Sequence, residues 1–408
     1  MNPVVVIPSY WTGHDEPSTL GEVGVYDYAT PITKPVPELQ TCLESLEGVR
    51  GVLRVIVLVI SEASCAEGAR ARVNAVCRMH PDLNPLVVGA READLMARAI
   101  GRVSPTMMGD VVSLRGYGAI RNMGLAVAAA LGHDVVVFMD DDEVVADENF
   151  LINAAYGLGL ATRQGLPIAV KSGCYHNSEG SPYATEEKPH WYDRRWSKRV
   201  EFNQMMHRLQ GGTRISRSSY ACGGCLAVGA RAFCSVPFDP FITRGEDLDY
   251  VLDLRIYGYD VWFDQDWWVW RKVPPLREGV ELFRQDAYRW EYEARKLQVA
   301  NGSIGLHPVR PESLRPYPAE WVSPEVSRRI STTALLRAVG CREHRRYLQI
   351  WRHGHAEARE WAAREGESYF RLQTYWSKMM GAIWANPVLA QELQRLGGVV
   401  QTGEERHG

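Results

Sequence analysis

The chain has 408 residues, of which 46% are hydrophobic, and its formal net charge at pH 7 is −3. This length and composition give enough core for one large domain with an appendage, or for two to three domains. The balanced charge, with no basic block that stands out, argues against nucleic acid as the main partner.

The start of the chain gives no sign of a targeting segment. Residues 1–3 lead directly into "VVVIPSY" without a basic region or a cleavage site. Apolar runs such as "VIVLVI" at 55–60 have the length of strands and are far shorter than a membrane span. We therefore expect a cytoplasmic protein without a transmembrane segment. We expect its cysteines, including the lone CxxC of Cys222 and Cys225, to be buried free thiols, because zinc would require a second pair.

The first half of the chain alternates strand-like and helix-like segments. Four apolar runs are typical of strands buried on both faces: residues 3–10, 53–61, 85–90 and 134–140. Three segments between them have helical periodicity: residues 37–48, 67–79 and 118–132. The first run is expected to stop at Pro8. This alternation predicts a mostly parallel, doubly wound α/β sheet, in which ligands bind beyond the carboxyl ends of the strands.

The second half is less regular. Residues 171–220 lose the periodicity and are predicted to form a long loop over the site. A helix is predicted from Glu246 to just before Gly258, with a buried apolar stripe. Proline-rich connectors follow residue 275, and residues 324–397 are predicted to be helical. The charges of this tail interleave, which favours a solvated helical appendage or a homodimer contact.

The strand predicted at 134–140 ends in four consecutive acids, Asp140, Asp141, Asp142 and Glu143. Two carboxylates 4 Å apart repel by about 4 kcal/mol at an effective dielectric constant near 20. In an extended chain Asp140 and Asp142 project to one side, where they can hold Mg²⁺ or Mn²⁺ through oxygen alone. Such a cation would offset the repulsion and bridge the phosphates of a nucleotide. A solvated acidic turn is the alternative interpretation.

Two other stretches agree with an anion site. Arg121 and Asn122 follow glycines in the first turns of a predicted helix, where the helix N-terminus and an arginine favour an anion. Glu246 and Asp247 begin the helix predicted further along the chain. The alternatives are a routine surface arginine for the first stretch and helix capping, worth about 0.3–1 kcal/mol, for the second.

Taken in order, these residues resemble a family 2-type glycosyltransferase of the GT-A fold. The resemblance spans residues 3 to about 265 and rests on "VVVIPSY", "VIVLVISEAS", "GYGAIRNMGLAVAAALGHDVVVFMDDDEVV", "GGCLAVGARAF" and "RGEDLDYVLDLRIYGYD". It implies transfer of a sugar from a nucleotide-sugar donor, such as a UDP- or GDP-sugar, to a hydroxyl acceptor, with Mn²⁺ or Mg²⁺ as cofactor. It also implies a domain at 1–275, divided into a nucleotide-binding half (1–143) and an acceptor half (144–275), before a mainly helical extension at 276–408.

The same resemblance assigns roles to residues that match the family's motifs. Those implied in nucleotide-sugar binding are Pro8, Ser9, Glu62, Arg121, Asn122, Asp140 and Asp141. The metal ligands implied are Asp140 and Asp142. Asp247, with its neighbour Glu246, is similar to the general base of inverting members, which takes the proton of the acceptor hydroxyl.

The chain departs from the family at the end of the last core strand, where many members add a histidine ligand. Arg271 and Lys272 stand there, so either these residues bind the diphosphate or aspartates alone hold the metal. Trp191, Trp196 and Trp268 are candidates for stacking on an acceptor sugar, although core packing explains each of them more simply.

Two other functions fit parts of the pattern. The run "VVVFMDDDEVV" also matches the nucleophile loop of haloacid-dehalogenase-type phosphatases, with Asp140 as nucleophile and Asp142 as acid/base. That motif normally lies on the first strand, and here three predicted strands precede it. A non-catalytic sugar-nucleotide-binding protein is the third possibility.

Overall fold

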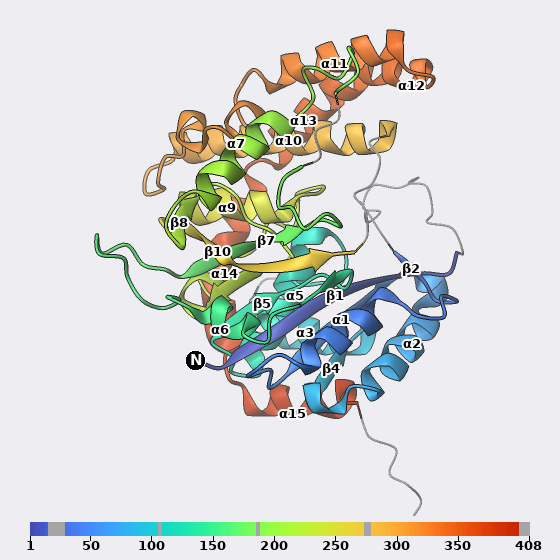
Figure 1. The fold of residues 1–408 in the computed structure, drawn as a ribbon, viewed down its shortest axis with the longest axis vertical. Helices are drawn as coiled ribbons and strands as arrows, with labels where there is room; N and C mark the ends of the chain where they lie inside the picture. Colours follow the sequence, from blue (N-terminus) through green and yellow to red (C-terminus); the bar gives the residue numbers. More distant parts are fainter. Residues whose placement is uncertain (15–28, 105–107, 185–187, 273–278, 400–408) are drawn as a thin grey trace, which may run out of the picture.

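The computed structural model of the chain describes all residues except 15–28, 105–107, 185–187, 273–278 and 400–408 (Figure 1). Its centre is a ten-stranded sheet with the order β4-β3-β1-β5-β9-β7-β10-β6, with β2 beside β1 and β8 beside β10. The strands are β1 (Pro3–Thr12), β2 (Thr30–Pro31), β3 (Val55–Ser61), β4 (Pro85–Val88), β5 (Val135–Phe138), β6 (Glu143–Val144), β7 (Val170–His176), β8 (Ile215–Ser218), β9 (Leu226–Gly229) and β10 (Val261–Arg271).

The sheet is mostly parallel, as predicted. β4, β3, β1 and β5 run in one direction. β9 is antiparallel to both β5 and β7, so β7 and its parallel neighbour β10 run in the same direction as β1. The carboxyl ends of β1, β3, β5, β7 and β10 therefore meet at one edge of the sheet, where a ligand is expected to bind.

Helices cover both faces of this sheet. They are α1 (Glu38–Glu47), α2 (Ala66–Arg78), α3 (Ala90–Gly101), α4 (Met108–Val111), α5 (Tyr117–Ala130), α6 (Phe150–Ala155), α7 (Arg199–Gln210), α8 (Ala230–Phe233), α9 (Glu246–Ile256), α10 (Val280–Gly302), α11 (Val326–Gly340), α12 (His344–Gln349), α13 (His355–Glu365), α14 (Ser368–Ile383) and α15 (Pro387–Gly397). Apolar side chains of α3, α5, α9, α14 and α15 pack on one face, and those of α1, α2, α6 and α7 pack on the other. The doubly wound arrangement predicted from the sequence is confirmed.

The strands alternate their side chains between these two cores. Val4 and Val6 of β1 belong to the first core, whereas Val5 and Ile7 belong to the second. This is why the strands are apolar throughout: both of their faces are buried. The strands predicted at 53–61, 85–90 and 134–140 and the helices predicted at 37–48, 67–79 and 118–132 are confirmed, with small differences at their ends.

The prediction that the first strand stops at Pro8 is wrong, because β1 continues to Thr12. The carbonyl of Val6 faces β5, since it accepts the amide of Met139 at 3.1 Å. Pro8 has the same orientation as Val6, but β5 has already ended at Phe138. The N–H that proline lacks therefore removes no bond from the sheet.

The prediction of a long loop at 171–220 is also wrong. This segment contains most of β7, the helix α7 and the strand β8. The strand β7 was not predicted because it begins with a polar residue, Lys171. This residue is fully buried, and its ammonium lies 2.8 Å from the carboxylate of Asp264. A polar residue that is paired in the interior looks like a surface residue in the sequence.

The helical tail is present, but it is not simply a solvated appendage. Tyr369, Leu372 and Trp376 of α14 are fully buried in the same core as α5 and β1. Helices α10 and α11 pack against the outer side of α9 in a separate apolar cluster. The described part of the chain contains no helix long and apolar enough to cross a membrane. The domain boundary at residue 275 stays a prediction.

Candidate functional site

The acids that follow β5 form a turn at the edge where the strands end. The amide of Glu143 donates to the carbonyl of Asp140 at 3.2 Å, so this segment is not extended as the sequence suggested. The carboxylate of Glu143 points back and accepts the amide of Asp140 at 3.0 Å. Because the chain turns, the carboxylates are directed to different partners and do not line one side of a strand.

Three of these carboxylates each contact a residue from another element. Asp140 lies 2.9 Å from the guanidinium of Arg121 on α5. Asp141 accepts the hydroxyl of Ser9 on β1 at 2.7 Å. The carboxylate of Asp142 lies 3.3 Å from the guanidinium nitrogen of Arg271, the last residue of β10.

Arg121 joins the acidic turn to α9. Its Nη2 contacts Asp140, and its Nε donates to Glu246 at 3.1 Å. The guanidinium lies over the ring of Phe138, 5.0 Å from its centroid, and is almost completely buried. Its Nη1 has no hydrogen-bond partner among the described residues. A buried, unsatisfied donor of this kind is available to a bound anion.

Gly223 and Gly224 allow the three acidic and basic stretches to meet. A Cβ atom on Gly223 would lie 2.9 Å from Arg121 and 3.4 Å from Asp247, and one on Gly224 would lie 2.1 Å from the carboxylate of Glu143. A side chain at Gly224 would have to displace the Glu143 carboxylate, which is hydrogen-bonded to the amide of Asp140. The motif "GGC" thus brings β9, the acidic turn and α9 into contact.

Asp247, the predicted base, lies in the first turn of α9 and is half-buried. Its Oδ1 accepts the amide of Leu248 at 2.7 Å. Gly245 precedes the helix with a positive φ of 69°, a conformation that favours glycine. This turn fixes the direction in which Glu246 and Asp247 leave the backbone.

Arg289 of α10 supports that turn, and no sequence pattern predicted this role. Its Nη2 donates to the carbonyl of Gly245 at 3.2 Å, and its Nε pairs with Glu293 at 2.9 Å. A Cβ atom on Gly245 would lie 2.0 Å from the Arg289 guanidinium. Burial opposes the charge of Arg289, but nearby groups, Glu293 foremost and Asp247 least, raise the pKa of Arg289 above its usual value. The predicted extension therefore reaches the residues next to the candidate base.

Burial and repulsion between neighbouring acids raise the pKa values of several carboxyl groups at the site. Burial raises the pKa of Asp142 to about 6, with Arg271 opposing the rise and Asp140 adding to it. Burial, followed by the charge of neighbouring acids, also raises the pKa values of Asp141 and Glu143 well above their usual range. The pKa of Glu246 is raised to about 7, again mainly by burial.

The residues present fit a divalent cation. The donors are carboxylates, which are the hard oxygen ligands that Mg²⁺ and Mn²⁺ prefer. The raised pKa values of the acidic turn are those expected where an additional positive charge would stabilise the ionised forms. That Asp140 and Asp142 hold the cation stays a prediction. Its contribution when bound would be to neutralise a diphosphate.

The other residues that the resemblance implied in nucleotide-sugar binding differ in their exposure and in their contacts. Glu62 is exposed directly after β3, beside the end of β1. Asn122 is completely buried, and its amide bonds to the backbone of Val111 and Phe238. The prediction that Asn122 binds the nucleotide is therefore corrected: it holds the segment after α8 against α5. Pro8 is a buried strand residue without a polar side chain.

The three tryptophans predicted at the acceptor site have separate environments. Trp196 is 2% exposed and packs edge-on against Phe283 and Trp321, so it offers no face to a sugar, and this assignment is corrected. Trp191 lies on the surface next to α11. Trp268 is half-buried and stacks on His176 with 4.4 Å between the ring centroids. Trp268 remains the candidate.

A second acidic cluster lies away from the predicted site. Asp239, Asp249 and Asp253 place carboxylate oxygens close enough together to hold a metal ion. The ammonium of Lys296 already occupies this position, at 3.0, 2.5 and 2.8 Å from the three carboxylates. All four side chains are fully buried. The cluster links α9 to α10 with a built-in cation.

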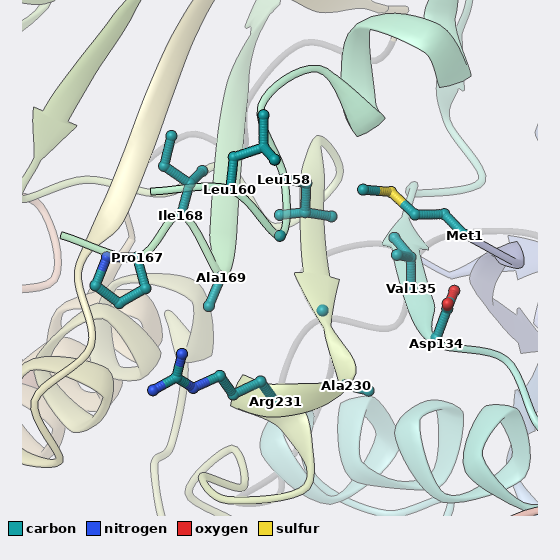
Figure 2. Close-up of a pocket in the computed structure, with 12 residues that line it drawn as sticks. Met1, Asp134, Val135, Leu158, Leu160, Pro167, Ile168, Ala169, Ala230 and Arg231 are labelled. Carbon is teal, nitrogen blue, oxygen red and sulfur yellow. The ribbon is translucent and has the colours of Figure 1, made fainter. Parts of the chain in front are cut away.

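Figure 2 shows a pocket at the other end of the strands. It is lined by Asp134 and Val135 at the start of β5, by Ala169 just before β7, and by Met1 and Arg231. The acidic turn follows the opposite end of β5. This pocket therefore takes no part in the candidate site.

No protein-family model and no curated protein matches the chain. Among solved structures, the mannosyltransferase PcManGT from Pyrobaculum calidifontis, in complex with GDP-Man and Mn²⁺, has 15% identity and a TM-score of 0.48, covering 97% of this chain and 87% of that chain. TarS from S. aureus has 13% identity and a TM-score of 0.39, covering 86% and 55%. Glucosyl-3-phosphoglycerate synthase from Mycobacterium tuberculosis, in complex with Mn²⁺ and UDP-Glc, has 15% identity and a TM-score of 0.36, covering 70% and 74%. We base the functional proposal on the side chains of the site.

Proposed function

We propose that the protein is a GT-A glycosyltransferase that moves a sugar from a UDP- or GDP-sugar to a hydroxyl acceptor with the help of Mn²⁺ or Mg²⁺. One observation carries this proposal: Arg121 joins the acidic turn at Asp140 to Glu246, the neighbour of Asp247, at the carboxyl edge of the sheet. A transferase needs an anion site and a general base side by side, and the proposal gives these roles to Arg121 and Asp247.

In the proposed reaction Asp247 takes the proton of the acceptor hydroxyl as its oxygen attacks the anomeric carbon of the donor. The bond from that carbon to the diphosphate breaks, and the nucleoside diphosphate leaves with the bonding electrons. Attack opposite the leaving group inverts the configuration at this carbon. Arg121, with its unpartnered Nη1, is suited to contact the diphosphate, because a guanidinium forms strong charge-assisted bonds to phosphate oxygens.

Arg271 supports a second contact to the diphosphate. It lies at the end of β10 and is only partly buried, while its partner Asp142 is buried. If Asp142 were to hold a cation, the Arg271 guanidinium could contact a phosphate oxygen instead of this carboxylate. Both alternatives drawn from the sequence, a basic contact to the diphosphate and a metal held by aspartates, are then satisfied together.

The proposal is tested by nucleoside-diphosphate binding with and without Mn²⁺. We expect calorimetry to show that Mn²⁺ tightens binding of UDP or GDP more than tenfold, and that Asp142→Ala removes this enhancement. The exposed Asp94→Asn substitution on α3 is the matched control and should leave it unchanged. Binding that is independent of metal in both proteins would contradict the cation site.

A phosphatase would behave differently. It would hydrolyse a generic phosphomonoester and form a phosphorylated Asp140, which mass spectrometry of the acid-quenched protein would detect. The proposed transferase should do neither. A protein that binds donor but transfers no sugar to any hydroxyl acceptor, and hydrolyses no donor, would instead be a binding protein.

A further inference from the structure

Lys198, the residue before α7, is a partly exposed cation among aromatic rings. Its ammonium lies 4.9 Å from the ring centroid of Trp290, 5.1 Å from that of Trp321 and 5.7 Å from that of Trp196. Trp290 and Trp321 are completely buried, and Trp196 is 2% exposed. The Lys198 side chain nevertheless keeps 26% of its surface exposed, so a molecule from solvent can reach this side chain.

This cation belongs to a region of positive potential around Asp286 of α10. The Lys198 ammonium lies 2.6 Å from one carboxylate oxygen of Asp286, and the Arg244 guanidinium lies 3.3 Å from the other. Burial would raise the pKa of this carboxyl group, but Lys198, Arg244 and Arg289 lower it to about 2. The pKa of Lys198 is lowered by burial, which Asp286 opposes, and by the cationic neighbours. Both shifts indicate a field that would stabilise a further anion beside Lys198.

The region adjoins the turn that carries Asp247, the candidate base. Arg244 stands three residues before Asp247 in the chain. Arg289, which directly precedes Trp290 on α10, donates to the carbonyl of Gly245 at 3.2 Å. Lys198 and Asp247 are thus both neighbours of the contact between Arg289 and Gly245.

Tyr317 connects the surroundings of Lys198 with those of Asp247. Its ring packs against the apolar cluster that contains the three tryptophans, and also against the core that contains Tyr220. Its carbonyl accepts the hydroxyl of Ser219 at 2.7 Å. The segment that begins there continues to Gly223, where a Cβ atom would lie 3.4 Å from the side chain of Asp247.

The Tyr317 hydroxyl is available to a ligand. It has no hydrogen-bond partner among the residues that the structure describes, and the side chain is partly exposed. Burial raises the pKa of Tyr317, Arg289 opposes the rise, and the charges of Glu293 and Asp247 add to it. The hydroxyl is therefore protonated at neutral pH and can donate a hydrogen bond near the candidate base.

We infer that Lys198 and the Tyr317 hydroxyl bind an anionic group of the acceptor, so that the acceptor is a hydroxyl compound that carries a phosphate or a carboxylate. This inference rests on the proposed function, because it takes Asp247 as the base that receives the acceptor's proton. Lysine binds such an anion as a point charge, and tyrosine adds a neutral donor. An uncharged sugar fits less well, since stacking needs an exposed ring face and the tryptophans around Lys198 are buried.

The inference is tested by calorimetry of the full chain with three probes that share hydroxyl groups and differ in charge: glycerol 1-phosphate, glycerate and glycerol. The titrations are done with saturating UDP or GDP and Mn²⁺, so that the diphosphate site is filled. We expect no binding of glycerol and binding of at least one charged probe, and the tighter of the two identifies a phosphate or a carboxylate as the recognised group. Lys198→Gln should weaken this binding at least tenfold, whereas Lys378→Gln, the matched change of an exposed lysine on α14, should not.

Two further variants keep the test decisive if Lys198→Gln is unstable. Lys198→Gln with Asp286→Asn removes both charges of the pair, which costs less stability than removing one, and should show the same loss of probe binding. Tyr317→Phe removes only a hydroxyl that has no partner among the described residues, so it should fold normally and weaken probe binding at least threefold. Thermal unfolding shows whether each variant is folded.

Three results would overturn the inference. The first is that neither charged probe binds the wild-type protein. The second is that a folded Lys198 variant binds the probe with wild-type affinity, which would leave Lys198 as a structural partner of Asp286. The third is that the Lys198 variants weaken binding of UDP or GDP as strongly as that of the probe, which would assign Lys198 to the donor.

Failure of the proposed function gives a different result. A protein that binds neither UDP nor GDP with Mn²⁺, but binds a charged probe that Lys198→Gln loses, would confirm the anion site. The same result would overturn the transferase and with it the acceptor role of this site.

Discussion

At the level of single residues, the role of each acid depends on the partner that its carboxylate contacts. Asp141 is paired with Ser9 inside the protein, whereas Asp140 and Asp142 face the guanidinium groups of Arg121 and Arg271. The resemblance implied donor binding by Asp140 and Asp141 and metal binding by Asp140 and Asp142. In the structure Asp141 joins the acidic turn to β1, whereas Asp140 and Asp142 each pair with an arginine.

Asp247→Asn should separate donor binding from transfer. The amide keeps the size of the side chain and can still accept the Leu248 amide, but it cannot take a proton. We expect the dissociation constant for the nucleoside diphosphate to change less than threefold and the transfer rate to fall at least 100-fold. Full activity in a direct transfer assay would move the base elsewhere, and Asp94→Asn again serves as the control.

At the scale of elements, α10 holds the start of α9 through Arg289. The guanidinium fills the space beside Gly245 and bonds to its carbonyl. Lys296, two turns further along the same helix, holds the middle of α9 through Asp249 and Asp253. The extension therefore positions the helix that bears the candidate base, although it lies outside the stretch that resembles a glycosyltransferase.

Removing Arg289 should lower turnover by loss of positioning. Arg289→Met alone leaves Glu293 buried without its partner, which is expected to cost about 3–5 kcal/mol of stability. The double variant Arg289→Met with Glu293→Leu removes both charges and should regain most of that stability. We expect the double variant to bind donor normally but to show at least a tenfold lower kcat. Wild-type kcat in a stably folded double variant would make Arg289 a purely structural residue.

At the scale of the whole molecule, buried acids set how stability depends on pH. The pKa values of Glu246 and Glu293 are raised to about 7 in the folded protein, mainly by burial. Between pH 4.5 and 7 the unfolded chain loses these protons while the folded protein keeps them. The free energy of unfolding should therefore fall as pH rises through this range, by roughly 3 kcal/mol for each group.

This fall is measured by denaturant unfolding at pH 5 and pH 7.5. Asp286, whose pKa is lowered to about 2 by Lys198 and its neighbours against the effect of burial, contributes stability that is lost only below pH 3.8. Asp286 therefore does not mask the decrease in the free energy of unfolding between pH 5 and pH 7.5. Glu246→Gln should flatten the pH dependence, because it removes one titrating group. Stability that rises steadily between the two pH values would contradict the assignment of buried, protonated acids.

The sequence predicted the secondary structure correctly where burial of apolar side chains was the only factor. Both faces of β1, β3 and β5 are buried, so their apolar runs were unambiguous, and α9 was predicted together with its acids and its buried stripe. It failed where burial was combined with polarity. Lys171 in β7 and Asn122 in α5 are buried and fully bonded, and a pattern based on hydrophobicity treats such residues as exposed or as free to bind a ligand.

Local periodicity and composition are enough to identify an α/β chain with a cluster of acids at the end of a buried strand. They do not reveal which charges meet, because that depends on the folded chain. Arg121, Arg271 and Arg289 come from segments far apart in the chain, and each meets its partner only through the packing of those segments. Electrostatic pairing depends on distance in space, and packing alone fixes that distance.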